Sequence, residues 1–229
     1  MTSLQKWGKS VRTTIPVMAG YLVLGAGFGI LLRMRGYGLG WALAMSAFIY
    51  AGSMQYVAID LLTGGASLLT TAVTTLLVNA RHLFYGISML ERYRAAGKYA
   101  PYLIFSLTDE TYSLVAARED LTGAECFRIS LLDQLYWVLG TALGSLAGAY
   151  LDFNATGIDF SLTALFLTVF TEQWLETKDH APALIGLGVS IVCRLLFGAD
   201  SFLLPTMGGM LCCLLVLDAR RTKKGGESV

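Results

Sequence analysis

Charged residues are scarce in this sequence. Asp, Glu, Lys and Arg make up 14% of its 229 residues, whereas an ordinary soluble domain carries about 25%. Hydrophobic residues make up 55%, and the mean hydropathy is +0.60. A single core surrounded by water cannot hold so large a share of apolar side chains in a chain of this size. The composition therefore excludes an ordinary soluble domain and indicates that a lipid bilayer is the solvent.

Motifs for catalysis and for nucleotide or metal binding are also lacking. The sequence has no nucleophile elbow, no phosphate-binding loop and no paired-histidine zinc motif. Its four cysteines have no metal-ligand spacing, and three lie in apolar runs, which is typical of reduced packing residues. We therefore expect no enzyme, no cofactor, no metal site and no ATP-driven pump on this chain alone. The net charge of +1 gives no indication of nucleic-acid binding.

Long uncharged runs are present instead. Because a membrane-spanning helix needs roughly 20 mostly apolar residues, we predict an all-α polytopic membrane protein with about six to eight transmembrane helices in one domain, 13–217. Basic residues mark the N-terminus (1–12) and the tail (218–229), which the positive-inside rule places in the cytoplasm. The predicted segments are 13–32, 36–59, 66–90, 99–117, 130–151, 160–177, 181–198 and 201–217.

The basic loop "ERYRAAGK" (91–98) argues against a plain row of eight spans. Eight spans would place this loop outside the cell, which is the wrong side for its charge. A broken or re-entrant segment within 66–117 would remove the conflict, provided that protein shields its backbone.

A weak internal repeat is also visible. "YLVLGAGFGILL" (21–32) resembles "YWVLGTALGSLA" (136–147), and both contain glycines spaced by four, which predict close helix packing. Since transporters are often built from two similar halves, 13–117 and 129–217 could be such halves.

The stretch "LLVNARHLFYG" places polar residues inside the helix predicted for 66–90. At about 100° per residue, Asn79 and His82 share one stripe with Thr75, whereas Arg81 faces elsewhere. The stripe predicts a polar lining that faces a cavity. The alternative is an arginine that reaches the headgroups and an asparagine that bonds to a neighbouring helix.

Two adjacent acids, Asp109 and Glu110, lie in the middle of the apolar run 99–117. Each charge costs about 2.5–3.5 kcal/mol at the centre of a membrane helix. Because neighbouring helical residues point about 100° apart, we expect one acid to face a cavity and the other a counter-charge, Arg81 or Arg194. A buried carboxyl suits proton coupling; the alternative is a structural ion pair.

Small residues interrupt the second apolar run at "AGSMQ" (51–55). An unwound turn there would offer backbone groups to a zwitterionic ligand; the alternative is ordinary packing of small residues. Glu172 ends a predicted segment and is interpreted as an interfacial charge.

Taken together, these stretches resemble the AzlC family of azaleucine-resistance and branched-chain amino acid permease proteins. The resemblance covers nearly the whole chain and implies a bacterial inner-membrane transporter that exports branched-chain or other apolar amino acids, coupled to protons. It also implies a small membrane partner subunit of the AzlD type. The stretches that carry it are "AGYLVLGAGFGILL", "SAFIYAGSMQYVAI", "LLVNARHLFYG", "LTDETYSL" and "GIDFSLTALFLTVF".

The resemblance and the polar positions together define a predicted site. We expect Asp109 and Glu110 to couple protons. The amino acid, the direction, the coupling ion and the oligomeric state stay open, as do two other functions: a non-transporting scaffold or regulatory subunit, and a passive channel. The predicted substrate-binding residues are Ser53, Gln55, Asn79, Arg81 and His82, supported by Gly52, Thr75 and Thr108.

Overall fold

A computed structural model describes residues 2–116, 118, 120–150, 163, 167, 170–171, 174–175 and 177–226. Every regular element among these residues is a helix, in agreement with the predicted fold class. The chain divides into two compact units, Met1–Thr163 and Ala164–Val229, which are described separately.

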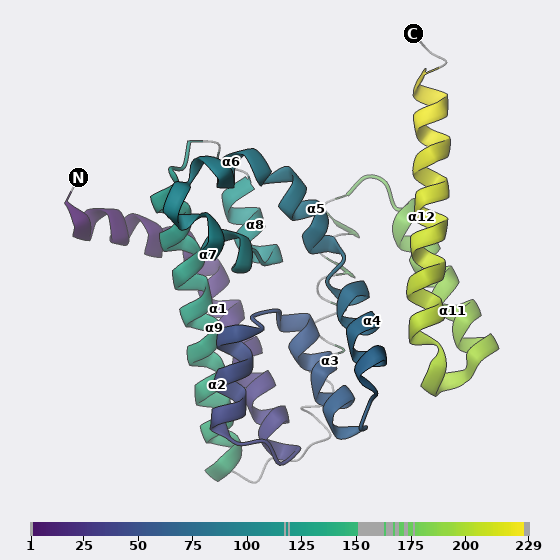
Figure 1. The fold of residues 1–229 in the computed structure, drawn as a ribbon, viewed down its shortest axis with the longest axis horizontal. Coiled ribbons are helices and arrows are strands. Elements are labelled where there is room, and N and C mark those ends of the chain that lie inside the picture. The colour runs from purple at the N-terminus through teal and green to yellow at the C-terminus, as the bar shows by residue number, and fades with distance from the viewer. Residues whose placement is uncertain are drawn as a thin grey trace. The chain divides into compact units, whose positions relative to one another are not determined.

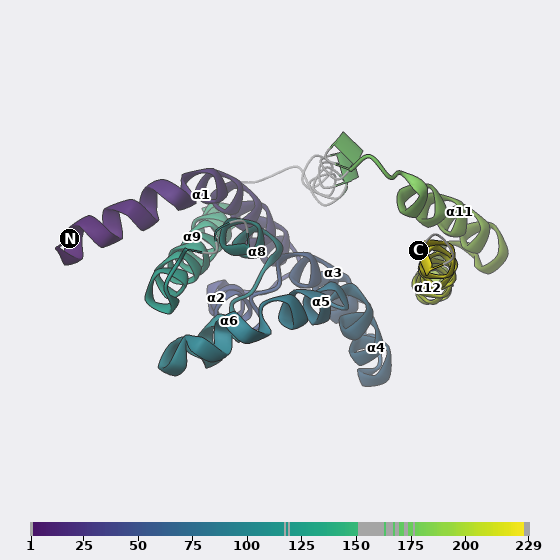
Figure 2. The same ribbon diagram turned by 90° about the horizontal axis from the view of Figure 1, so that it is seen from above.

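Two long helices form the spine of the first unit. α1 (Ser3–Met34) and α9 (Gly123–Tyr150) run side by side and in the same direction (Figures 1 and 2). Their backbones touch at glycines: a Cβ atom on Gly25 would lie 2.9 Å from the Trp137 carbonyl oxygen, and one on Gly140 would lie 2.7 Å from that of Leu22. The predicted glycine packing faces are thus confirmed, and the two similar stretches of the sequence lie against each other.

The second apolar run forms a hairpin. α2 (Leu39–Phe48) runs antiparallel to α9. It begins after Gly38, which lies near Arg33 at the end of α1 and therefore near the end of α9. Its last turn lies beside the first half of α9, where Gln134 donates to the Ala47 carbonyl oxygen at 3.0 Å. The chain reverses at Tyr50, which has φ 43°, a conformation that costs a non-glycine residue about 1–2 kcal/mol. α3 (Gly52–Thr63) then returns along α1.

The prediction of one helix over 36–59 is therefore wrong. Of the residues expected to unwind, 51–55, Ala51 is the non-helical N-cap of α3 and 52–55 are its first turn, so the reversal lies just before most of them. The sequence there, Ile49 and Tyr50, contains no glycine or proline; instead, Gln134 on α9 binds the Ala47 carbonyl oxygen at this end of α2.

The third run is a single path with an interruption. α4 (Leu68–Val78) begins at the N-cap Ser67, after Gly65 with φ 62°, and α5 (Arg81–Ser88) follows Asn79 and Ala80. The prediction of one continuous helix over 66–90 is wrong, because the backbone at this point tightens to bonds between residues three apart, such as His82 N–H to Asn79 C=O at 2.9 Å. Such a tightened turn inside a helix is typical of a hinge or a functional site.

The fourth run is a second hairpin. After α6 (Leu90–Ala95) and the 3₁₀ turn η1 (Gly97–Tyr99), α7 (Ala100–Phe105) descends along α9, and α8 (Asp109–Ala116) returns. The Tyr102 hydroxyl donates to Gln134 on the way down, and Thr111 donates to Asp133 on the way back. The prediction of one helix over 99–117 is wrong, since residues 106–108 are not helical. An interruption was expected within 66–117, and the structure has two, one at Asn79 and Ala80 and one at residues 106–108.

The loop "ERYRAAGK" lies at the same end of this unit as the N-terminus. Ala96 is in close contact with Gly123 at the start of α9, where Glu125 is 3.7 Å from Lys9. The Arg92 guanidinium donates to backbone carbonyl groups of residues 115, 118 and 121. The charge conflict of a plain row of eight spans is absent here, because the hairpin 39–63 starts and finishes at the opposite end of the unit, and the path from α4 to α5 then returns to the end that holds the N-terminus (Figure 1).

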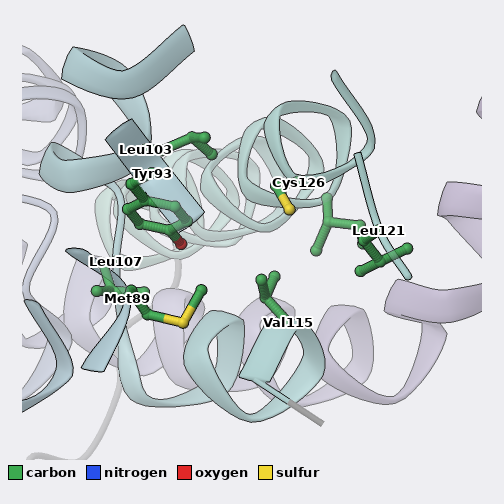
Figure 3. Close-up of a cluster of buried hydrophobic side chains, with 8 residues drawn as sticks. Met89, Tyr93, Leu103, Leu107, Val115, Leu121 and Cys126 are labelled. Atoms are coloured by element: carbon green, nitrogen blue, oxygen red, sulfur yellow. The ribbon is translucent and has the colours of Figure 1, made fainter. Parts of the chain in front are cut away.

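A cluster of buried apolar side chains joins α6, α7, α8 and α9 beneath that end (Figure 3). It fixes the base of the second hairpin against the spine, so that the tip of the hairpin is held in place. The side chains labelled in Figure 3 are Met89, Tyr93, Leu103, Leu107, Val115, Leu121 and Cys126.

The second unit contains α11 (Ala181–Ser201) and α12 (Leu203–Gly226), which pack against each other. They correspond to the segments predicted for 181–198 and 201–217. Arg194 lies 5.3 Å from the centre of the Phe202 ring. Glu172 lies outside the described residues. By length and composition alone, Leu4–Met34 and Ala181–Gly198 are suited to cross a membrane.

Candidate functional site

The three interruptions of the first unit meet at one pocket of about 540 Å³. Its floor includes residues 49–51 at the tip of the first hairpin, Asn79 at the break between α4 and α5, and Leu107 at the tip of the second hairpin. From there the pocket follows α5 to Arg94. Helix interruptions at membrane depth are tolerated where protein shields them or where they line a cavity, and here they do line one. The remaining wall is largely apolar: Leu83, Ile87, Leu90, Ile104 and Phe105.

Arg81 connects the helix starts around this pocket. Its Nη2 atom lies 2.8 Å from an Asp109 carboxylate oxygen and donates to the Ser53 hydroxyl at 3.0 Å. These residues belong to the first turns of α5, α8 and α3, respectively. A cation at a helix N-terminus is unfavourable and an anion is favourable, so Asp109 neutralises a charge that α5 alone would disfavour. Of the two counter-charges that the sequence offered for Asp109, the structure pairs it with Arg81.

Asn79 and His82 are the predicted site residues that line the pocket. The Asn79 side-chain oxygen is buried and has no hydrogen-bond partner among the described residues. The His82 Nδ1 atom lies 3.2 Å from the Asn79 carbonyl oxygen. Thr75, by contrast, donates its hydroxyl to the Thr71 carbonyl oxygen in its own helix and is not part of the lining. Of the predicted stripe, only Asn79 and His82 therefore line the pocket. Arg81 faces another side of the helix, as predicted.

Gln55 is placed in the protein interior. Its side chain is fully buried; its oxygen accepts from Trp137 Nε1 at 2.9 Å, and its nitrogen donates to the Ser46 hydroxyl at 3.1 Å. Ser46 in turn donates to Thr141 at 2.9 Å. This network joins α2 and α3 to α9. Gly52 has a related role, because a Cβ there would lie 3.1 Å from the Trp137 ring.

Glu110 points away from the pocket toward α1, whereas its neighbour Asp109 points to Arg81. The Tyr21 hydroxyl donates to the Glu110 carboxylate at 2.7 Å and also lies 2.7 Å from the Thr108 hydroxyl. The two acids thus diverge as helix geometry predicted. Thr108 caps the first turn of α8, since its hydroxyl accepts from the backbone N–H of Thr111 at 3.3 Å.

Sequence reasoning missed Asp133. This residue is fully buried on α9 and accepts a hydrogen bond from Thr111 at 2.8 Å. A signal was available, because Asp133 is the one charged residue of the apolar run 130–151. The argument applied to Asp109 and Glu110, that an acid in such a run requires partners, applies to it equally.

A helical fold of low charge, with two hairpins and a broken helix whose polar groups gather at a shielded centre, is that of an all-α membrane protein. Comparison with known proteins identifies which kind. The AzlC protein family matches residues 16–151, and the chain belongs to this family.

Named relatives agree with that assignment. The branched-chain amino acid transport protein AzlC of Bacillus subtilis is 46% identical over 89% of this chain and 82% of its own length. A membrane protein of Helicobacter pylori is 42% identical over 89% of this chain and 91% of its own length. The inner membrane protein YgaZ of Escherichia coli is 26% identical over 90% and 87%, respectively. No solved structure matches the chain.

Proposed function

We propose that this protein is the large subunit of a proton-coupled exporter of branched-chain or other apolar amino acids in a bacterial inner membrane. A small partner subunit of the AzlD type would complete it. The observation that carries the proposal is the pocket at the three helix interruptions, which has Asn79 and His82 at one end, Arg94 at the other and largely apolar walls between them. The name of the Bacillus subtilis relative, a branched-chain amino acid transport protein, supports the substrate class.

The pocket suits an aliphatic amino acid in size and chemistry. Its volume of about 540 Å³ lies within the range of about 300–1,000 Å³ for small-molecule sites. The unpartnered side-chain oxygen of Asn79 is an acceptor for the substrate ammonium. The aliphatic wall along α5, including Leu83 and Ile87, suits a branched side chain.

Arg81 and Asp109 supply a means of coupling. Export driven by an inward proton gradient requires that the proton and the substrate bind in turn, not together. As a carboxylate, Asp109 would bind the substrate ammonium, while Arg81, which it now contacts, turns to the substrate carboxylate, for which its planar donors are well matched. Protonation of Asp109 from the outer side would weaken this binding and release the substrate, and loss of the proton to the cytoplasm would restore the ion pair. Asp109 thus holds either a proton or the substrate, so that inward proton movement is linked to export.

The orientation follows from charge. The N-terminus, Arg92, Arg94 and Lys98 lie at one end of the first unit, together with the start of α9, and the positive-inside rule places such an end in the cytoplasm. The pocket extends from the interruptions toward Arg94. This direction agrees with loading from the cytoplasm, as export requires.

A matched pair of leucines tests the site. Leu83 lines the pocket and is 62% exposed, whereas Leu76 on α4 is 63% exposed and does not line it. In proteoliposomes containing both subunits, we expect Leu83→Trp to weaken valine binding and slow valine flux by about tenfold or more, because overfilling a site costs about 1–3 kcal/mol. Leu76→Trp should change both by less than about twofold.

The other functions predict different results. Equal effects of the two tryptophans would contradict the pocket as the substrate site. Flux from the partner subunit alone would indicate that this chain is a scaffold, and flux without saturation or pH dependence would indicate a channel. Direction is tested in cells fed with valine-containing dipeptides: deletion of an exporter raises intracellular valine, whereas unchanged amino-acid pools would contradict export.

A further inference from the structure

A continuous row of oxygen atoms joins the partly buried carboxyl group of Glu110 to the fully buried one of Asp133 in the first unit. Glu110 contacts the Tyr21 hydroxyl at 2.7 Å, and Tyr21 contacts Thr108 at 2.7 Å. Thr108 contacts Thr111 at 3.1 Å, and Thr111 contacts Asp133 at 2.8 Å. The row crosses from α8 to α1, returns to α8 and ends on α9. None of its members lines the substrate pocket.

The number of hydrogens in this row is informative. Four oxygen–oxygen contacts need four hydrogens if each is to be a hydrogen bond, but Tyr21, Thr108 and Thr111 carry only one hydroxyl hydrogen each. With both Glu110 and Asp133 ionised, one contact would consist of two oxygens with no hydrogen between them. One additional proton, held by either carboxyl, completes all four bonds.

The surroundings also favour that additional proton. Asp133 is fully buried, its second oxygen has no hydrogen-bond partner, and no cation contacts it among the described residues. Two ionised carboxylates this close, one fully and one partly buried, would repel each other and lack a counter-charge, because the nearby guanidinium is already paired. Among the described residues, the titratable groups that interact electrostatically with the two carboxyls include Tyr21, Tyr50, Tyr102, Asp109 and Arg81.

We propose that Glu110 and Asp133 share one proton, which moves between them along Tyr21, Thr108 and Thr111, and that Asp133 is the inner proton-binding residue of this protein. When Asp133 holds the proton, it donates to Thr111, and each hydroxyl donates to the next as far as Glu110. Transfer breaks the O–H bond of Asp133 and forms one on Thr111, while each hydroxyl passes its own hydrogen onward. Glu110 ends protonated, all three hydroxyls are neutral again, and the negative charge moves to Asp133.

Tyr50 places this row next to the pocket. It lines the pocket at the tip of the first hairpin and lies within electrostatic range of both Glu110 and Asp133. A ligand that moves the tip would therefore change the surroundings of both carboxyls. The use of the proton in transport rests on the function proposed above, whereas the shared proton can be measured without any transport.

The first experiment detects the proton directly. Infrared difference spectra of the purified protein in H₂O and D₂O should show a protonated carboxyl band that both Asp133→Asn and Glu110→Gln alter. Asp60→Asn, which changes an exposed carboxyl at the end of α3, should leave it unchanged. Thr111→Val keeps both carboxyls but cuts the row, and it should shift the band. If Asp133→Asn fails to fold, Thr111→Val decides. A band that responds to Glu110→Gln alone overturns the proposal.

The second experiment separates this proposal from the proposed function. In proteoliposomes with both subunits, Asp133→Asn should abolish valine flux driven by a pH gradient, yet retain valine exchange at equal pH, which needs no net proton movement. Gradient-driven flux that survives in Asp133→Asn overturns the role of Asp133. If the wild-type protein moves no valine at all, the proposed function fails, while the infrared result still decides whether the proton is shared.

Discussion

The continuous pair α1 and α9 differs from the interrupted helices beside it in how it uses small residues and backbone. In the pair, glycines bring two intact helices into backbone contact, as at Gly25 and Gly140. In the hairpins and in α4–α5, the helices stop near the middle of the unit, and polar side chains gather at the stops. One region thus supplies a rigid frame, and the other supplies a site.

The frame and the site depend on each other through α9. Its glycine face packs on α1, while other positions bond to the hairpins: Trp137 and Thr141 to the first, Gln134 to both, and Asp133 to the second. Carbonyl groups at helix ends lack partners within the helix. Gln134 meets this need at the end of α2, and so the spine stabilises the interruptions.

The largest effect is expected from damage to the spine. Gly144 faces the backbone of Ala26 so closely that a leucine side chain cannot fit without separating α1 from α9. We expect Gly144→Leu to lower the stability by more than about 3 kcal/mol, because backbone cannot move aside as a side chain can. Thermal unfolding in detergent, followed by circular dichroism, measures this. Gly20→Leu on α1, where no heavy atom lies within 4 Å, is the control and should be nearly neutral.

A smaller effect is expected at the link between the interrupted helices. Arg81→Gln and Asp109→Asn should each destabilise the protein, and the double variant should lose less than their sum. Because both side chains are about one-third exposed, the coupling should be about 1 kcal/mol or less. A double-mutant cycle from the same unfolding measurements gives this number. Strict additivity would mean that the ion pair does not hold the starts of α5 and α8 together.

Effects of similar, small size are expected from single methyl groups in the two regions. Gly65→Ala, in the turn before α4, puts a Cβ on a residue with φ 62° and should cost about 1 kcal/mol. Gly8→Ala, inside α1 and free of neighbours within 4 Å, should stabilise by about 0.5–1 kcal/mol. The unfolding midpoint should therefore fall in Gly65→Ala and rise in Gly8→Ala. Equal shifts would contradict the left-handed turn.

The sequence predicted the spine well and the interruptions only in part. Glycines spaced by four along uncharged runs are a local signal, so α1 and α9 could be identified directly. The hairpins could not, because Ile49 and Tyr50 are good members of an apolar helix and the reversal depends on contacts more than 80 residues away, such as Gln134 with Ala47. Charge conflict in the loop 91–98 indicated that an interruption was needed and placed it within 66–117, although it did not indicate that the run 36–59 is also a hairpin.

The site residues, too, could be predicted from the sequence only in part. Arg81 and Asp109 could be matched from the sequence, since charges of opposite sign in apolar runs need each other. Gln55 was expected at the ligand, but Trp137 and Ser46 occupy both ends of its amide, which no spacing could reveal. The prediction that Thr75 lies on the same face as Asn79 and His82 was wrong because the helix tightens at Asn79. The angle between successive side chains changes at such an interruption, so residues on its two sides no longer share a face.

The dependence of both hairpins on α9 has a consequence for biosynthesis. A helix of ten residues such as α2 is about 15 Å long, half of what a bilayer requires. Neither hairpin can enter the membrane as a pair of ordinary spans. Trp137, which binds Gln55, and Asp133, which binds Thr111, are made only after both hairpins. The polar tips must therefore wait near the insertion machinery, or at the membrane surface, until α9 arrives. Completion of α9 is then the event that closes the first unit, and a nascent chain truncated before it would expose these groups to quality control.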